Sequence, residues 1–194
     1  AHGSSCRGAI HLWSLDGAAA DSEFVPSSEV LERELTLGSL SALQLAQGLL
    51  RAAWRDPPRL WLVTRGVHPV GDVAVTGLSQ APLWGLGRVI AEEQRGLWGG
   101  LVDLPPAAAA DDAARWLVQE VVSDDDEDQI AYHDGQRYVA RLVNPPSDAV
   151  LPPVQFRTDA TYLITGGLGG IALHVARWMV ECGARRLILM GRTP

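Results

Sequence analysis

One segment constrains the fold of this 194-residue chain more than any other feature. Residues 161–172 read TYLITGGLGGIA, an apolar run that leads into a glycine-rich turn and then into a helix-forming stretch. A second apolar run follows at 186–190, and Gly183 stands before it where a helix C-cap glycine belongs. This order predicts a strand, a glycine turn that opens a helix, and a second, parallel strand, which together form a β-α-β unit.

The residues upstream predict a second unit of the same class. A buried strand is predicted first, and a loop rich in serine follows it. The predicted strands are 8–13, 59–64 and 98–104, and the predicted helices are about 30–54, 80–93 and 111–122. Asp111 or Asp112 is expected to cap the last helix, and Asp134-Gly135 is expected to turn a hairpin over 129–143. Alternating strands and helices predict an α/β fold with two Rossmann-like units.

The boundary between the two units is expected in a proline-rich stretch. Residues 144–159 contain four prolines and little periodicity, so we interpret them as a linker or a crossing segment. The first unit then spans 1–143 and the second spans 160–194. A single strand–helix–strand piece cannot bury its own faces, so we expect the second unit to be C-terminally truncated.

Composition excludes several classes of function. The formal charge of -7 argues against nucleic acid as a partner, and no apolar run approaches the roughly 20 residues of a membrane helix. All 16 basic residues are arginines, which excludes Schiff-base chemistry and a Walker-type phosphate loop. Only two cysteines occur and no signal peptide is evident, so a reducing, cytoplasmic location is expected.

No metal site is predicted. The five histidines are scattered, and no cysteine or histidine has zinc-ligand spacing. The acidic run at 124–128 has two interpretations, a cation site or a solvated turn. Adjacent carboxylates in a loop favour the solvated turn.

The glycine turn carries the chemistry that the sequence predicts. Glycines let the backbone approach a pyrophosphate, and the helix N-terminus offers free N–H groups to its oxygens, so the turn predicts dinucleotide binding. The second strand ends at Gly191-Arg192, where NAD-binding folds usually have an acidic residue. A guanidinium suits a 2′-phosphate, which favours NADP(H). The alternative is a tight turn with a solvated arginine at a strand end.

The same residues resemble a known family. Thr165-Gly166-x-x-x-Gly170-x-Ala172 resembles the TGxxxGxG turn of short-chain dehydrogenase/reductases, and the longer string around it looks like the ketoreductase domain of modular type I polyketide synthases. Upstream strings are similar to that family's structural subdomain. They are HLWSLD at 11–16, LWLVTRG at 60–66, APLWGLGR at 81–88, WGGLVDL at 98–104 and RYVARL at 137–142.

The resemblance implies a function for each unit. Residues 1–143 would be a non-catalytic scaffold that lacks its first strands, and 160–194 would begin the catalytic unit. Reduction would use NADPH and would act on a β-ketoacyl thioester carried by acyl carrier protein, within a homodimeric synthase whose other domains are partners. The residues implied to line the pyrophosphate are Gly166, Gly167, Leu168, Gly169, Gly170 and Ile171, and Arg192 is implied to bind the 2′-phosphate.

Two departures from the family pattern qualify this expectation. Ala172 replaces the last glycine of the turn, at a position that serves close helix–strand packing. The family's Ser, Tyr, Lys and Asn catalytic residues would lie beyond the second strand, so we expect no catalytic residue in this chain and no activity from it alone. The alternative function is a structural scaffold, a pseudo-ketoreductase that positions neighbouring synthase domains.

Overall fold

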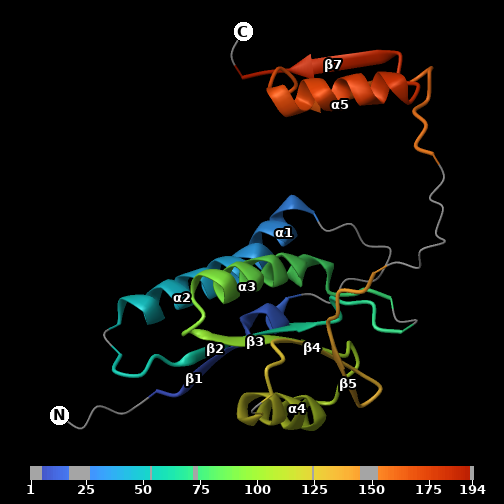
Figure 1. Ribbon diagram of the computed structural model, residues 1–194. Helices are drawn as coiled ribbons and strands as arrows, with labels where there is room; N and C mark the ends of the chain where they lie inside the picture. The colour runs from blue at the N-terminus through green and yellow to red at the C-terminus, as the bar shows by residue number, and fades with distance from the viewer. Residues whose placement is uncertain are drawn as a thin grey trace. The chain divides into compact units, whose positions relative to one another are not determined.

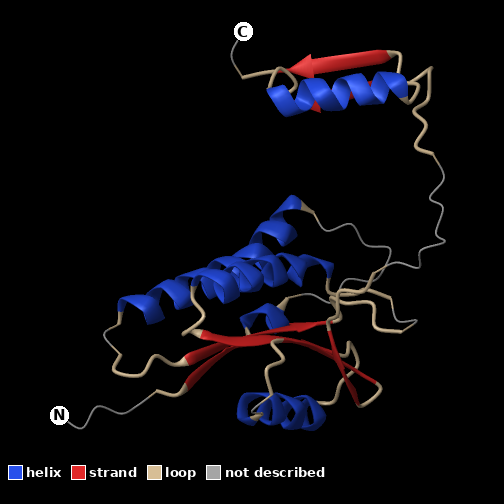
Figure 2. Ribbon diagram, viewed as in Figure 1, coloured by secondary structure: helices blue, strands red, loops and turns tan. Residues whose placement is uncertain are grey.

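The chain folds into two units, which are visible in Figures 1 and 2. Unit 1 is Ala1–Leu142 and unit 2 is Val143–Pro194, and each has its own sheet. The structure is a computed structural model. It describes residues 6–17, 27–52, 54–71, 74–123, 125–144 and 153–192.

The sheet of unit 1 has five strands in the order β1-β2-β3-β4-β5. The first four strands are parallel, and β5 is antiparallel to β4. The strands are β1 (Gly8–His11), β2 (Arg59–Arg65), β3 (Trp98–Leu104), β4 (Gln129–His133) and β5 (Gln136–Val139). Most residues of the central strands β2 and β3 are buried because helices cover both faces of the sheet. This arrangement confirms the predicted α/β fold class.

Two layers of helix enclose that sheet, as Figure 2 shows. One face carries α1 (Ser28–Leu35), α2 (Ser41–Arg51) and α3 (Ala81–Glu93), and the other carries α4 (Ala110–Val122). Short helical turns η1 (Trp13–Asp16) and η3 (Leu78–Gln80) complete the unit. Each face has its own buried cluster. The core on the α2–α3 side contains Leu60, Leu62, Leu83, Trp84 and Leu101, and the core on the α4 side contains Val63, Val102, Leu104, Ala113 and Ile130.

The helix predicted over 30–54 differs from the structure in its bounds and its interior. It begins at Ser28, where the Ser27 hydroxyl accepts a hydrogen bond from the Val30 amide. A π-helical turn, η2 (Thr36–Leu40), separates α1 from α2, and α2 ends at Arg51. Trp54 lies outside the helix and donates its indole N–H to the Leu49 carbonyl oxygen at 2.8 Å.

Two further expectations are wrong in detail. The helix α4 begins at Ala110 with Ala109 as its N-cap, so neither Asp111 nor Asp112 is the cap. Both carboxylates lie in the first turn, where they face the positive end of the helix.

The strand β1 was predicted to be buried, but it has a single neighbour at the sheet edge, and Ile10 is 42% exposed there.

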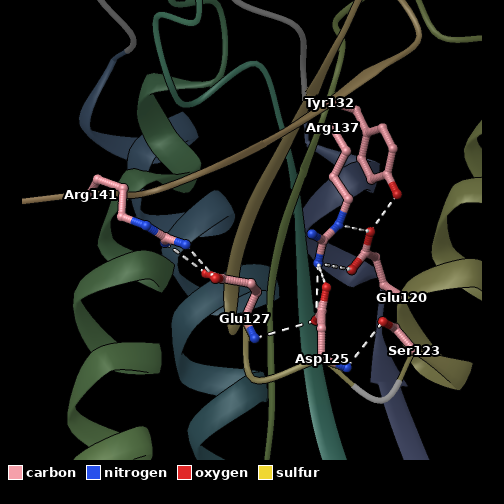
Figure 3. Close-up of polar contacts among 7 residues, drawn as sticks. All are labelled: Glu120, Ser123, Asp125, Glu127, Tyr132, Arg137 and Arg141. Carbon is pink, nitrogen blue, oxygen red and sulfur yellow. Dashed lines mark hydrogen bonds and ion pairs between the residues drawn. The ribbon is translucent and has the colours of Figure 1, made fainter.

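A polar network fastens the β4–β5 hairpin to α4 (Figure 3). The buried Glu120 carboxylate of α4 accepts hydrogen bonds from the Tyr132 hydroxyl and from the Arg137 guanidinium, whose Nε lies 2.8 Å from Oε1. Arg137 also pairs with Asp125 at 2.9 Å. The hairpin turns at Asp134 and Gly135, both with positive φ, as the Asp-Gly signal predicts.

Two residues of the acidic run, Asp125 and Glu127, are paired with arginines. Asp125 contacts Arg137, and Glu127 accepts two hydrogen bonds from Arg141. Arg141 lowers the pKa of the Glu127 carboxyl by hydrogen bonding to its charged form. Asp124 lies outside the described residues. Among the described residues, no group of His, Cys, Asp or Glu has the arrangement of a metal site.

Unit 2 consists of β6 (Thr161–Thr165), α5 (Gly170–Glu181) and β7 (Arg186–Met190), with β6 parallel to β7. Residues 153–159, the described end of the predicted linker, belong to this unit. The Phe156 amide donates to the Cys182 carbonyl oxygen at 2.8 Å, and the Phe156 ring meets Tyr162 and Trp178 edge-on. Within the described residues, no helix combines the length and apolar character that a membrane crossing requires.

Candidate functional site

The glycine-rich turn lies at the carboxyl edge of the β6–β7 pair. Thr165 is the last residue of β6, and it is paired with Met190, the last residue of β7. The Gly167 amide then donates to the Met190 carbonyl oxygen at 2.9 Å, so the turn is tied directly to the end of β7. Ligands of open α/β sheets bind at this edge, outside the carboxyl ends of the strands.

Two glycines make the turn possible for different reasons. Gly166 has φ of 67°, a left-handed conformation that a side chain disfavours. Gly167 is packed so closely that a Cβ there would lie 2.6 Å from the Ile164 carbonyl oxygen and 2.9 Å from Leu189 Cα. The packing role predicted for Ala172 stays a prediction. The tight approach to β7 that the structure shows is at Gly167, a contact with a residue 22 positions later that local sequence does not reveal.

The helix that follows presents an open N-terminus. Gly169 is the N-cap of α5 and has no side chain with which to cap it. Leu173 lies within α5, and its amide donates to the Gly169 carbonyl oxygen at 3.1 Å. The amides of Gly170 and Ile171 precede it and have no acceptor within the helix. These donors and the positive end of the helix dipole form a site suited to a phosphate.

Arg192 lies at the same edge as the turn. It follows β7 by two residues and is exposed, and among the described residues no carboxylate forms an ion pair with it. The residues that the sequence predicts to bind a cofactor therefore lie at one edge of the β6–β7 pair, and their cofactor role stays a prediction: Gly166, Gly167, Leu168, Gly169, Gly170, Ile171 and Arg192. The Leu168 and Ile171 side chains are 57% and 83% exposed beside the turn.

The corresponding edge of unit 1 is filled by the chain itself. The buried Asp103 carboxylate, on β3, accepts hydrogen bonds from the Thr64 hydroxyl at 2.7 Å and from the amides of Val67 and His68 at 2.9 Å each. The Trp84 indole donates to the Thr64 hydroxyl at 2.8 Å. Burial raises the pKa of the Asp103 carboxyl. Sequence reasoning missed this cluster because its members come from separate elements.

Two of the tyrosine hydroxyls are engaged in structural contacts. Tyr132 donates to Glu120, and burial and that carboxylate raise the pKa of its hydroxyl. The Tyr162 oxygen accepts a hydrogen bond from the Arg157 amide at 2.8 Å. Neither hydroxyl lies in an arrangement that prepares it to donate a proton to a substrate.

Comparison with protein families covers both units. The model of the KR domain matches residues 160–194. Residues 10–142 match a model described as the Rossmann fold domain of the polyketide synthase extender module SpnB. The second match alone covers more than half of the chain.

Curated relatives are large synthases. The chain is 43% identical over 154 residues to erythronolide synthase EryA3 of Saccharopolyspora erythraea, an alignment that covers 79% of this chain and 5% of the relative. It is 38% identical over 197 residues to a phenolphthiocerol/phthiocerol polyketide synthase of Mycobacterium tuberculosis strain H37Rv, with 98% and 10% covered. The chain thus spans a tenth or less of the length of these relatives.

Solved structures agree with the family models. A C2-type ketoreductase from a modular polyketide synthase is 32% identical with a TM-score of 0.68, over 94% of this chain and 37% of that one. Structures of A-type ketoreductases from modular polyketide synthases give 32% identity and a TM-score of 0.63, over 97% and 38%.

Proposed function

The chain belongs to the ketoreductases of modular polyketide synthases, and on that premise we propose that unit 2 holds part of the NADPH site of a β-ketoacyl reductase. The observation that carries the proposal is the bond from the Gly167 amide to Met190, which holds the glycine turn beside the end of β7. A Cβ at Gly167 would fill that close approach. The turn residues 166–171 would line the pyrophosphate.

Specificity for the phosphorylated cofactor would come from Arg192. Its exposed guanidinium follows β7. NAD-binding folds usually have an acidic side chain at this position, which holds the ribose 2′-hydroxyl. A guanidinium binds a phosphate through paired, charge-assisted hydrogen bonds. The proposed cofactor is therefore NADPH, whose 2′-phosphate NADH lacks.

The reaction would reduce the β-keto group of an acyl chain carried as a thioester on acyl carrier protein. NADPH supplies the hydride when it is bound. The residues of this chain bind and orient the cofactor, and the proton donor would come from residues outside this chain. The absence of lysine supports that division, because no tyrosine of this sequence has the neighbouring ammonium that would lower its pKa.

Unit 1 would serve as the scaffold of the reductase. An α/β sheet binds its ligand at the carboxyl edge of its strands. In unit 1 the Asp103 cluster occupies this edge, which supports a structural role. The same observation favours the second candidate, a pseudo-ketoreductase that positions neighbouring domains of the synthase. Turnover of a β-keto thioester by the full-length synthase separates the two, since a pseudo-ketoreductase binds NADPH without turnover.

Replacement of Arg192 tests the cofactor assignment. We expect Arg192→Ala to weaken NADPH binding by about tenfold or more, since hydrogen bonds to charged groups contribute about 1.5–3 kcal/mol. NADH binding should change little. Calorimetric titration of both nucleotides measures the two losses, and Arg186→Ala, an exposed arginine at the opposite end of β7, is the matched control. Equal losses for NADPH and NADH would contradict the assignment.

A further inference from the structure

Unit 1 contains a cavity that the proposed NADPH site does not use. It has a volume of about 310 Å³ and is lined by residues of α3 and of the β4–β5 hairpin. Its lining includes Trp84 and Arg88 from α3, Gln129 and Tyr138 from the hairpin, and His68 from the loop after β2. The volume falls within the range of small-molecule sites, at its lower end.

Arg88 places one positive charge at this cavity. Its guanidinium carbon is 5.9 Å from the centroid of the Trp84 ring, and its Nε donates to the Gln129 side-chain oxygen at 3.0 Å. These two contacts orient the planar group. In the part of the chain that the structure describes, no carboxylate forms an ion pair with Arg88. A guanidinium held in this way is suited to bind a carboxylate through two parallel hydrogen bonds.

Trp84, Tyr138 and Val139 give the cavity aromatic and apolar surface. Trp84 is 4% exposed, and its indole N–H is already bonded to Thr64, so it offers ring carbons to the cavity. Val139 adds an aliphatic surface, and Tyr138 adds a second aromatic ring. Aromatic rings of a ligand pack favourably against such walls, in offset or edge-on geometry.

His68 adds no second charge. Its ring centroid lies 3.9 Å from that of Trp84, in an edge-on arrangement. Burial lowers the pKa of the imidazole, so it is neutral at pH 7. Its buried Nε2 has no hydrogen-bond partner among the described residues, and such an atom is costly to leave unsatisfied. The cavity thus combines one cation with neutral walls that are partly aromatic and partly aliphatic.

We propose that this cavity binds a small aromatic monocarboxylate, with its carboxylate on Arg88 and its ring against Trp84 and Val139. One cation matches one negative charge. The aromatic and aliphatic walls favour an apolar ring over a small polar anion. All the residues that line the cavity belong to unit 1, so this proposal does not rest on the proposed NADPH site.

Benzoate is the probe, and the indole N–H of Trp84 is the reporter. In a ¹⁵N-labelled full chain, the seven tryptophans give six other indole signals as internal controls. We expect benzoate to shift the Trp84 signal along a saturating curve. Benzamide, which lacks the charge, and acetate, which lacks the ring, should shift it at least about tenfold more weakly at equal concentration.

Two variants of Arg88 and one matched control complete the test. Arg88→Ala should abolish the saturating shift, and Arg88→Lys should weaken it because an ammonium lacks the guanidinium fork. Arg115→Ala should leave it unchanged, since Arg115 is an exposed residue of α4 paired with Asp112 on the other face of the sheet. No shift with benzoate, an equal shift with benzamide or acetate, or an unchanged shift in either Arg88 variant would overturn the proposal.

Discussion

Gly167 is the residue on which the geometry of the cofactor turn depends. Its amide is bonded to the Met190 carbonyl oxygen, and its Cα faces Leu189 and the Ile164 carbonyl oxygen too closely for any side chain. Gly170, three residues later, stands in open space, where an added Cβ would meet nothing within 4 Å. Two glycines of one motif therefore have different physical roles.

This difference gives a prediction at the scale of single residues. Gly167→Ala should destabilise unit 2 by about 1–3 kcal/mol, because the backbone of the glycine turn and β7 must move apart to admit the methyl group. Gly170→Ala is the control, and it should be neutral or stabilising by up to about 1 kcal/mol, because alanine is the better helix former. Hydrogen exchange of the β6 and β7 amides measures both changes. Equal effects of the two substitutions would contradict the steric account.

At the scale of elements, the β4–β5 hairpin depends on one buried carboxylate. Glu120 of α4 binds both Tyr132 and Arg137, which come from neighbouring strands of the hairpin (Figure 3). Glu127 and Arg141, which flank the hairpin, form a second ion pair, but Arg141 is largely exposed. Solvent screens the exposed pair far more than the buried one.

Removal of the two carboxylates should therefore have unequal effects. Glu120→Ala leaves the Tyr132 hydroxyl unsatisfied and Arg137 with one partner fewer, and we expect it to lower the free energy of unfolding of unit 1 by about 2 kcal/mol. Glu127→Ala should change that free energy little. Urea denaturation followed by far-UV circular dichroism measures both variants. A larger loss from Glu127→Ala would refute this ranking.

Several elements were predictable because their signals are local. The bounds of β3 match the prediction because a mostly apolar run that ends before two prolines has few alternatives. The hairpin turn was predictable from Asp134-Gly135, because these two adjacent residues readily adopt the positive φ angles that the turn requires. The N-cap of α4 was predicted wrongly because Asp111 is favourable both at a cap and in the first turn.

Contacts between distant residues were not predictable in this way. The glycine turn was recognised as a candidate site, but the close contact of Gly167 with Leu189 depends on the pairing of two strands. The bond between Glu120 and Arg137 likewise joins elements that only the fold brings together. The role of Arg192 toward a 2′-phosphate stays a prediction.

At the scale of the whole molecule, the two units differ in how much they bury. Unit 1 has a sheet covered on both faces, and residues of β2 and β3 such as Leu62 and Leu101 are fully buried. Unit 2 has two strands and one helix, and Leu163, Ile188 and Met190 are each more than half exposed. A two-stranded sheet with exposed apolar residues has little to hold it together.

Hydrogen exchange of the chain should reflect this inequality. We expect backbone amides of β6 and β7 to exchange at least about tenfold faster than those of β2 and β3, since local opening is easiest where few apolar contacts are buried. Exchange measured by mass spectrometry or NMR on the 194-residue chain resolves the two sets. Similar protection in both sheets would show that unit 2 is stabilised by interactions beyond its own core.

The π-helical turn between α1 and α2 has a consequence for comparing related chains. The Ser41 amide reaches back to the Thr36 carbonyl oxygen, so this turn holds one residue more than a regular α-helical turn. A relative with a one-residue gap at 36–40 would keep a continuous helix and the same apolar face on either side. Insertions and deletions of a single residue in this helix are therefore best assigned to 36–40, and an alignment that opens its gap elsewhere would pair core positions with surface ones.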